Sequence, residues 1–285
     1  MTCLIDVTQG PLVMGILNVT PDSFSDGGEF QNPSDAVRRG MVMINEGADI
    51  IDIGGESTRP GAQSVSVEME IGRVASVIHK IKEQIKFKIA NHAVALSVDT
   101  AKSEVAKLAL EAGACMINDV SAGLGDPAMF DIVRHYKAHI VLMHMQGCPL
   151  TMQDSPNYLD VVDDVLSFLA ARVCEAEKAG ISRDRILIDP GIGFGKKSSD
   201  NIKLIASLER FVSLGLPVVL GASRKRFMGS ICKANGPREL VGATVATTVI
   251  GALKGVSVFR VHDVKENRQA LDVTKAIQGI NRKPH

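Results

Sequence analysis

The sequence PLVMGILNVTPDSFSDGG (residues 11–28) joins a short apolar run to a polar loop, and the chain repeats this succession along its length. The apolar part, residues 11–16, is typical of a buried strand. The loop that follows is rich in oxygen-bearing side chains and ends in two glycines, which suits a hard cation and a phosphate-bearing ligand. An ordinary polar turn is the alternative, because Pro, Asp, Ser and Gly are common in turns.

Eight apolar runs alternate with eight segments of helical periodicity. The predicted strands are residues 11–16, 48–53, 95–98, 115–117, 140–143, 185–188, 217–220 and 256–261, and the predicted helices are residues 33–47, 66–83, 102–112, 127–136, 158–179, 199–214, 239–253 and 264–277. Continuous apolar strands are typical of a parallel sheet covered by helices. Eight such units, with no linker between them, predict one α/β domain over residues 1–285, a (β/α)8 TIM barrel. A doubly wound open sheet is the alternative.

The composition indicates which partners to expect. Of the 285 residues, 45% are hydrophobic, and 32 Lys and Arg balance 32 Asp and Glu, so no overall field attracts nucleic acid or a membrane surface. Aromatic residues make up 4% and Trp is absent, which disfavours a surface that stacks single-stranded bases. No apolar run approaches the ~18–20 residues that span a bilayer. We therefore expect small-molecule substrates, with no nucleic acid and no membrane.

The cysteines indicate the compartment. They lie far apart, without a Cys-x-x-Cys pair, and are Cys3, Cys115, Cys148, Cys174 and Cys232. An odd, scattered set predicts reduced thiols in a cytoplasmic protein. The N-terminal segment has neither the basic nor the apolar region of a signal peptide, so we expect none.

In each predicted unit, the polar residues follow directly after the apolar run. In a parallel barrel these positions gather on the C-terminal face, where barrel active sites lie. One Asp at such a position is often only a helix N-cap, but the repetition over eight units predicts a site. The residues are Asn18, Glu56, Ser57, Thr58, Arg59, Asp99, Asn118, His144, Asp189, Ser223, Arg224, Lys225, Arg260 and His262.

Part of the chemistry of this site follows from the residue types. Asp99 and Asp189 end apolar strands, so their carboxylates are expected to be desolvated and to need N–H donors. With Asn118 they fit a flat heterocycle that has a guanidine-like edge. The cations around them can hold phosphate or carboxylate groups, and they are Arg59, Lys225, Arg260 and His262.

The stretch DPGIGFGKK (residues 189–197) resembles a phosphate loop but departs from the pattern twice. Pro190 stands where the first glycine belongs, and Lys197 where Ser or Thr belongs. We interpret the glycines as allowing a close approach to a ligand, with Phe194 as a stacking or packing wall. Five histidines lack metal-ligand spacing and are expected at the surface or in helix packing: His79, His92, His135, His139 and His285.

Taken in order, the loop motifs resemble those of dihydropteroate synthase. They are LNVTPDSFSDGG (17–28), DIGGESTRPGA (52–62), SVDT (97–100), INDV (117–120), MHMQG (143–147), DPGIGFGK (189–196), GASRK (221–225) and RVHDV (260–264). The resemblance spans essentially the whole chain and implies the same barrel. It also implies the condensation of 6-hydroxymethyl-7,8-dihydropterin diphosphate with para-aminobenzoate, which yields 7,8-dihydropteroate and diphosphate in folate synthesis.

The resemblance further implies a role for individual residues. The pterin would be held by Asp99, Asn118, Asp189 and Lys225, with Val120, Met143 and Gly221 beside it and Arg260 stacked on its face. The diphosphate would be held by Asn18, Arg260 and His262, with Mg2+ at Asn18 and Asp26. The aminobenzoate site would be shaped by Thr58, Arg59, Pro60, Phe194 and Ser223. The catalytic set would be Asp26, Thr58, Arg59 and Lys225.

The resemblance implies a homodimer formed through the late helices, and a target of sulfonamide drugs. Residues 241–253 agree with the dimer, because they contain more small and β-branched residues than one barrel-facing stripe needs. Two other functions remain open. A corrinoid-dependent methyltransferase domain shares the pterin-edge residues, but would lack the SFSDGG and STRPGA loops. A catalytically silent pterin-binding paralogue is the other, and the intact motifs speak against it.

Overall fold

The computed structural model describes residues 5–7, 10–20, 33–57, 61–88 and 94–281. Its strands are β1 (Leu12–Asn18), β2 (Ile50–Gly54), β3 (Ala95–Asp99), β4 (Met116–Asp119), β5 (His139–Met143), β6 (Ile186–Asp189), β7 (Val219–Leu220) and β8 (Val258–Val261). Its helices are α1 (Pro33–Asn45), α2 (Val67–Lys88), α3 (Ser103–Ala112), α4 (Met129–Tyr136), α5 (Val161–Lys178), α6 (Ser198–Ala206), α7 (Leu208–Val212), α8 (Arg226–Cys232), α9 (Val241–Leu253) and α10 (Val264–Asn281).

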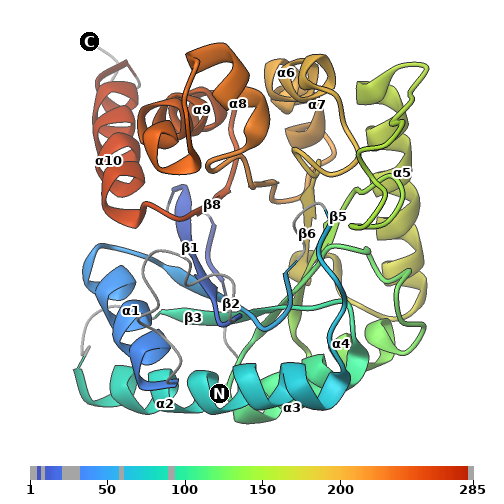
Figure 1. The fold of residues 1–285 in the computed structure, drawn as a ribbon, viewed down its shortest axis with the longest axis vertical. Coiled ribbons are helices and arrows are strands. Elements are labelled where there is room, and N and C mark those ends of the chain that lie inside the picture. The colour runs from blue at the N-terminus through green and yellow to red at the C-terminus, as the bar shows by residue number, and fades with distance from the viewer. Residues whose placement is uncertain (1–4, 8–9, 21–32, 58–60, 89–93, 282–285) are drawn as a thin grey trace.

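The strands form one parallel sheet that curls into a nearly closed barrel, with the helices around it (Figure 1). Within the described residues the strand order is β6-β5-β4-β3-β2-β1-β8-β7, and β1 pairs with both β2 and β8. A bridge between Ile188 and Val218 joins the two ends of this order. The predicted TIM barrel is confirmed, and the open doubly wound sheet is wrong.

Several helices differ from the prediction, and α2 extends to Lys88, beyond its predicted end at residue 83. Residues 199–214 form two helices, α6 and α7, separated at Ser207, whose φ of −113° leaves the helical region. Serine favours such breaks because its hydroxyl competes for backbone hydrogen bonds. α5 begins later than expected, because the Asp160 side chain accepts hydrogen bonds from the N–H groups of Val162 and Asp163 as an N-cap. α8 was not predicted at all.

A ring of apolar side chains fills the lower part of the barrel. Each of the eight strands contributes one residue: Met14, Ile50, Ala95, Met116, Val141, Leu187, Val219 and Val258. A larger apolar layer lies between the sheet and the helices. This arrangement agrees with the closed, side-chain-filled interior of such barrels. The ring therefore closes the end of the barrel at which the strands begin, and the end at which the strands finish is left for polar residues.

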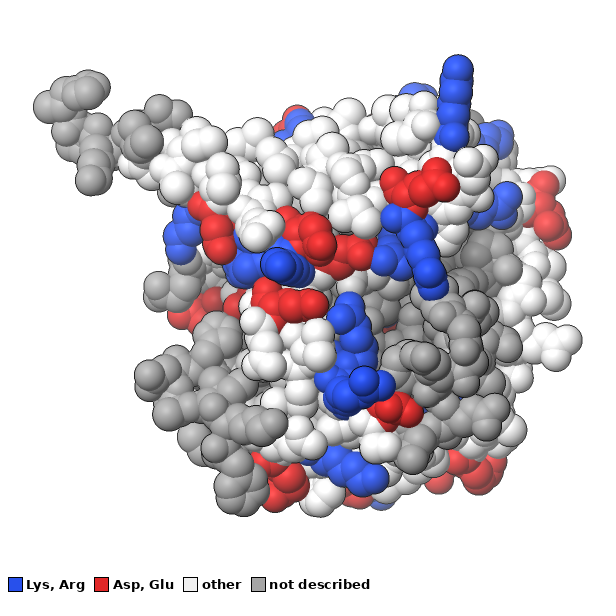
Figure 2. All heavy atoms as spheres, turned by 60° about the vertical axis from the view of Figure 1, so that its left-hand side comes forward, with Lys and Arg blue, Asp and Glu red and all other residues white. Residues whose placement is uncertain are grey.

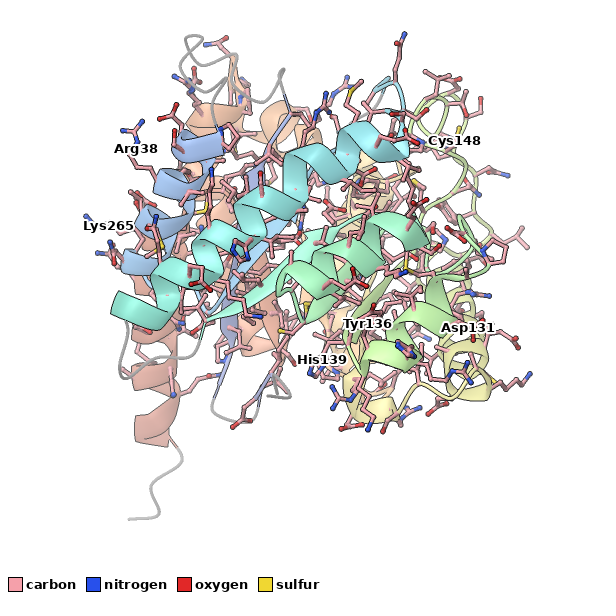
Figure 3. All side chains as sticks on the ribbon, turned by 90° about the horizontal axis from the view of Figure 1, so that it is seen from below. Arg38, Asp131, Tyr136, His139, Cys148 and Lys265 are labelled. Atoms are coloured by element: carbon pink, nitrogen blue, oxygen red, sulfur yellow. The ribbon has the colours of Figure 1, made fainter. Side chains whose placement is uncertain are left out.

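Strand β5 runs from the closed end of the barrel to the end that carries the polar residues. Figure 3 shows His139, which begins this strand, and Cys148, which follows it, far apart along the barrel axis. His139 was expected at the surface or in helix packing, yet its side chain is 2% exposed and accepts a hydrogen bond from the Ile5 N–H at 3.4 Å. It therefore belongs to the closed end.

Cys148, Cys174 and Cys232 are free cysteines. Searching the described residues finds no helix long and apolar enough to cross a membrane.

Candidate active site

A cavity of about 1980 Å³ lies at the C-terminal ends of the strands. This volume gives room for more than one small ligand. Its lining includes eleven of the residues that the sequence predicted for the site: Asn18, Glu56, Ser57, Asp99, Phe194, Gly221, Ser223, Arg224, Lys225, Arg260 and His262.

The floor of the site follows from the period of the strands. Alternate residues of a strand face the same side, so the next inward positions lie two residues beyond the apolar ring. Most of these positions are polar, in contrast to the ring itself. They are Ile16, Asp52, Ser97, Asn118, Met143, Asp189, Gly221 and Arg260. The polar floor is thus stacked directly on the apolar ring.

Arg260 and Asp52 form the centre of a buried network. The Arg260 guanidinium donates from Nε to Asp52 Oδ2 at 2.7 Å and from Nη2 to Asp99 Oδ2 at 2.6 Å. Asn118 donates from Nδ2 to the same Asp52 oxygen at 3.0 Å. Asp52 is fully buried and was not predicted as a site residue. Asp52 could have been recognised from the sequence, because it is a charged residue at an inward-facing position of an otherwise apolar strand.

Burial raises the pKa of both predicted floor carboxyls, Asp99 and Asp189. Desolvation raises the pKa of Asp99 to about 7, against the opposing effect of Arg260, and Asp52 raises it further. Desolvation also raises the pKa of Asp189, while the Gly191 N–H and the cation of Lys225 lower it. The side chains of Asp99 and Asp189 are 5% and 4% exposed, so the prediction that they are desolvated is confirmed.

The glycine loop, residues 190–196, follows β6 along the cavity. Its Gly191 N–H donates to Asp189 Oδ1 at 2.7 Å. A Cβ at Gly191 would lie 1.9 Å from the His144 carbonyl oxygen, and Gly191 has a φ of +69°. Gly191 is therefore required for the approach of the loop to the chain after β5, a reason that the sequence did not give. Phe194 forms a wall, with the Lys225 ammonium 4.1 Å from its ring centre.

Ser223 and His262 meet where the residues that follow β7 and β8 line the cavity. The Ser223 hydroxyl lies 3.0 Å from His262 Nδ1 and also accepts from the His262 N–H at 3.2 Å. The next residue, Arg224, has a φ of +57° and a paired interaction with Asp263, with distances of 3.0 and 2.6 Å. This ion pair ties the loop after β7 to the loop after β8. The two loops thus hold Ser223 and His262 together.

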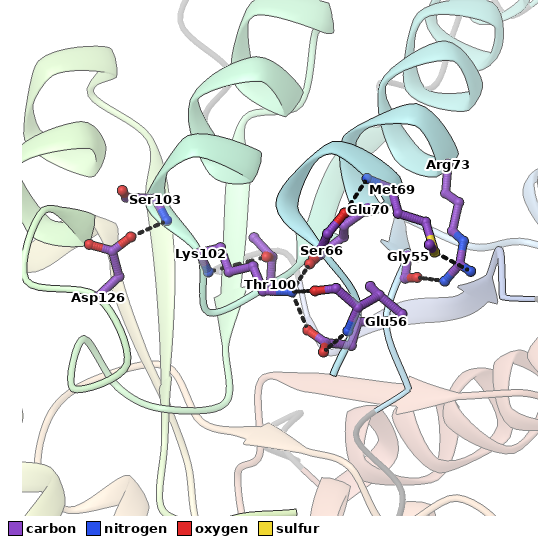
Figure 4. A network of polar contacts seen from close by, with 11 residues as sticks. Gly55, Glu56, Ser66, Met69, Glu70, Arg73, Thr100, Lys102, Ser103 and Asp126 are labelled. Carbon is purple, nitrogen blue, oxygen red and sulfur yellow. Dashed lines mark hydrogen bonds and ion pairs between the residues drawn. The ribbon is translucent and has the colours of Figure 1, made fainter. Parts of the chain in front are cut away.

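The SFSDGG and STRPGA loops carry predicted substrate residues and are here called the two substrate loops, and the STRPGA loop is anchored at both of its described ends. Lys102 donates from Nζ to Glu56 Oε2 at 2.8 Å, to Glu70 Oε2 at 2.7 Å and to the Val65 carbonyl at 2.9 Å (Figure 4). Glu56 Oε1 in turn accepts from the Val65 N–H at 2.9 Å. The network joins the end of β2 to the beginnings of α2 and α3. Four predicted residues of the two substrate loops lie outside the described residues: Asp26, Thr58, Arg59 and Pro60.

Three other predicted residues are buried and do not belong to the cavity lining. Met143 is buried at the end of β5, 3.3 Å from the position of a Cβ at Gly191. Val120 is buried directly after β4. His144 is turned away into the interior, where its Nδ1 lies 2.9 Å from the ammonium of Lys196. Lys196 was not singled out in the sequence.

The face of the molecule in Figure 2 carries charges of both signs. Figure 2 shows lysine and arginine side chains beside aspartate and glutamate side chains on the face in view. This agrees with the balanced charge of the chain. An anionic ligand is therefore best served by the local cations of the cavity.

Comparison with known proteins defines the class of this barrel. The profile of the family described as "Pterin binding enzyme" matches residues 14–262, so the chain belongs to the pterin-binding enzymes. The dihydropteroate synthase of Escherichia coli K12 is 45% identical over 266 residues, which cover 93% of this chain and 91% of that protein. Within the family, the chain thus groups with the dihydropteroate synthases, transferases of folate synthesis.

Two solved structures support the same grouping. The dihydropteroate synthase of Xanthomonas albilineans in complex with 7,8-dihydropteroate has a TM-score of 0.85 and 43% identity, covering 98% of this chain and 97% of that one. The Yersinia pestis dihydropteroate synthase with a sulfonamide drug complex has a TM-score of 0.89 and 40% identity, covering 96% of each chain. A corrinoid-dependent methyltransferase is not favoured by these relatives.

Proposed function

We propose that this chain condenses 6-hydroxymethyl-7,8-dihydropterin diphosphate with para-aminobenzoate, forming 7,8-dihydropteroate and diphosphate. The observation that carries the proposal is a buried floor of carboxylates and an amide, formed by Asp99, Asn118 and Asp189, next to a cationic rim. The X. albilineans relative is described in complex with 7,8-dihydropteroate, the product of this reaction.

The floor suits the pterin. Asp99 Oδ1 is buried and finds no hydrogen-bond partner in the described part of the chain. A buried acceptor without a donor costs free energy, and the guanidine-like edge of a pterin supplies N–H groups. Asp189 Oδ2 lies 3.5 Å from the position of a Cβ at Gly221, so the glycine keeps the space before this carboxylate open. Arg260, with its guanidinium fixed by two carboxylates, offers a flat surface for stacking.

The rim suits the diphosphate. Asn18 and His262 line the cavity at the ends of β1 and β8, and Lys225 lies beside Phe194. The Ser223 hydroxyl lies 3.0 Å from His262 Nδ1 and so orients the imidazole where it lines the cavity, and a protonated imidazole attracts an anion. We assign His262 to anchoring the leaving group and not to proton abstraction.

The residues present fit Mg2+. Asn18 lines the cavity at the end of β1, and its Oδ1 lies 3.6 Å from the position of a Cβ at Gly54, at the edge of the polar floor. Oxygen is the ligand that Mg2+ prefers. The described residues contain no group of three His, Cys, Asp or Glu placed for a metal, so Asn18, Asp26 and the substrate diphosphate would hold the ion. When bound, it would neutralise charge on the leaving group.

The bond changes need little from the protein beyond position and charge. The bond from the pterin methylene carbon to the diphosphate oxygen breaks, the aniline nitrogen bonds to that carbon, and its proton leaves to water. The electron-rich pterin stabilises charge at the methylene, so a strong base is not required. We propose that Phe194, Ser223 and the residues of the 58–60 loop shape the aminobenzoate side. Asp26, Thr58 and Arg59 would order the two substrate loops around the bound substrates, with Lys225 at the reacting groups.

A product assay with both substrates tests this function. Purified protein with Mg2+ and both substrates should form dihydropteroate, and a sulfonamide should compete with para-aminobenzoate. A pterin-binding protein without catalytic activity would bind the pterin and form no product. That outcome would overturn the proposal.

We further propose a cytoplasmic homodimer built from one barrel domain per chain. The apolar residues Ile250 and Leu253 of α9 and Val273 and Ile277 of α10 are 41%, 59%, 60% and 58% exposed. The two helices contact each other, so these residues offer apolar surface on neighbouring elements. Exposed apolar surface of this kind is typical of a protein interface.

A further inference from the structure

The glycine loop is held along its length by side chains that come from other elements. Gln153 donates to the Gly193 carbonyl at 2.7 Å, and Asn201 Oδ1 accepts from the Gly193 N–H at 2.7 Å. Tyr158 donates its hydroxyl proton to the Gly195 carbonyl at 2.6 Å. The backbone on both sides of Phe194 is therefore fixed, although three of the seven loop residues are glycine.

Lys196 completes this set from inside the protein. Its side chain is 3% exposed, and its Nζ lies 3.0 Å from the Phe194 carbonyl, 2.9 Å from His144 Nδ1 and 3.3 Å from the His144 carbonyl. An ammonium has three N–H donors, and here each has an acceptor. A buried amine that is satisfied in this way stabilises one loop position, because any shift of the loop leaves a donor unpaired.

His144 is suited to accept this hydrogen bond. Burial and the neighbouring Lys196 lower the pKa of His144 to about 3, so the ring is neutral near pH 7. Burial lowers the pKa of Lys196 to about 7, while the charges of Asp189 and Asp200 raise it and Lys225 lowers it. A neutral imidazole has one acceptor nitrogen, and contact with Lys196 assigns that role to Nδ1. The edge of the His144 ring packs against Phe168, with ring centres 4.9 Å apart.

The bond from Lys196 acts on the residue whose ring lines the cavity. The Phe194 ring packs against Lys225, while the Phe194 carbonyl accepts a hydrogen bond from Lys196, a nearly buried side chain at the edge of the same cavity. In the described part of the chain Lys196 makes no hydrogen bond to the floor side chains of Asp99, Asn118 and Asp189, and it acts on Asp189 only through its charge. A change at Lys196 should therefore move the Phe194 wall and leave the floor in place.

We propose that Lys196 is a positioning residue for the second substrate, acting by fixing the Phe194 wall against His144. This inference rests on the proposed function, in which Phe194 shapes the aminobenzoate side of the cavity. Lys196 touches neither substrate in this scheme. Its contribution is to hold one wall of the site in the position that para-aminobenzoate requires.

Steady-state kinetics of Lys196→Met test the proposal, because Met keeps the length of the side chain and removes its donors. We expect the KM for para-aminobenzoate to rise about tenfold, as loss of a hydrogen bond from a charged group predicts. The Kd of the free pterin, measured by calorimetry, should stay within about twofold of the wild-type value. Lys203→Met, at an exposed position of α6, is the matched control and should change neither constant.

A double-mutant cycle separates positioning from a general loss of structure. In a Phe194→Ala background, Lys196→Met should raise the KM no further, since the wall that it positions is gone. An equal further rise in that background, or an unchanged KM in Lys196→Met alone, would overturn the inference. If Lys196→Met fails to fold, His144→Asn and His144→Leu measure the same contact. Asn retains an acceptor and should preserve the KM, whereas Leu should raise it.

These experiments distinguish a failure of the proposed function from a failure of the role proposed for Lys196. A wild-type protein that forms no dihydropteroate overturns the proposed function itself. A wild-type protein that is active, combined with an unchanged KM in Lys196→Met, overturns only the role of Lys196.

Discussion

The Arg260 guanidinium donates a hydrogen bond to Asp52 from 2.7 Å, across the floor of the barrel between β8 and β2. The two residues are 208 positions apart in the chain, and Asp52 is fully buried. This pair fixes the plane of Arg260 and, through the same carboxylate oxygen, the amide of Asn118. Two predicted pterin residues thus depend on one carboxylate that we do not assign to the substrate.

Asp52→Ala should strongly destabilise the protein. The change leaves Asn118 without its acceptor and Arg260 with one carboxylate in place of two, and breaking a buried ion pair typically costs ~3–5 kcal/mol. Chemical denaturation measures the free energy of unfolding. Asp272→Ala is the matched control, because its pair with Arg268 has a 63% exposed carboxylate and should contribute under ~1 kcal/mol. Equal effects of the two changes would contradict the assignment.

Asp189→Ala should weaken binding of the free pterin at least a hundredfold. The substitution removes the carboxylate that is expected to accept hydrogen bonds from the N–H groups of the pterin edge. Loss of a buried charged partner typically costs ~3–5 kcal/mol, which corresponds to at least a hundredfold increase in Kd. Calorimetry measures the Kd, with circular dichroism to verify the fold. The exposed Asp131→Ala should have no effect. Near-native pterin affinity in Asp189→Ala would reject the role of this residue.

Pterin binding should strengthen as the pH rises through about 7, where Asp99 becomes an ionised acceptor. Burial raises the pKa of Asp99, and the negative charges of Asp52, Glu70 and Asp119 raise it further against Arg260. The folded state therefore holds this proton at pH values where the unfolded chain, with a pKa of about 3.9, has lost it. Its contribution to stability is present below about pH 4 and is lost as the pH rises to about 7.

Asp52→Asn provides the test of this pH dependence. Removal of the neighbouring negative charge lowers the pKa of Asp99, so the midpoint of pterin binding should move to lower pH. Calorimetry from pH 5 to 9 on both proteins, or the carboxyl chemical shift of Asp99, measures the midpoint. A midpoint that stays in place, or moves to higher pH, would show that another group controls binding.

The Arg224–Asp263 pair should control diphosphate binding more than pterin binding. Arg224 has a left-handed φ of +57°, which is costly for a residue with a side chain, and its ion pair holds the turn in place. Arg224→Gln and Asp263→Asn should each weaken diphosphate binding, because Ser223 and His262 lose their alignment. Their effects should be strongly non-additive, with a coupling on the order of 0.5–3 kcal/mol. Additive effects in the double mutant would show that the pair does not act as a unit.

The quaternary structure can be tested at α9 and α10. Light scattering should give twice the 30.4 kDa of one chain, and Leu253→Asp with Val273→Asp should reduce the mass to that of one chain. A carboxylate buried in an apolar interface without a partner loses its hydration, and this cost favours the separated chains. The exposed Ile202→Asp on α6 should leave the mass unchanged. A wild-type protein of about 30 kDa would contradict the dimer.

Much of the site was determined by the sequence itself. The period of two in a strand places Asp189 two residues beyond Leu187 of the apolar ring, and Asn118 two residues beyond Met116. Because parallel strands end on one face of a barrel, the residues that follow eight apolar runs must meet there, whatever their distance along the chain. Asp52 obeys the same rule, two residues beyond Ile50, and could have been found in this way.

The tertiary structure decided which of these residues bind one another. The pairs Asp52 and Arg260, His144 and Lys196, and Arg224 and Asp263 join loops whose relative positions depend on how the barrel closes and how each side chain packs. Local sequence determines where a strand ends and which side a residue faces. It does not determine partners from distant strands, because hydrogen bonds depend on distances of a few tenths of an ångström that only the packed barrel fixes.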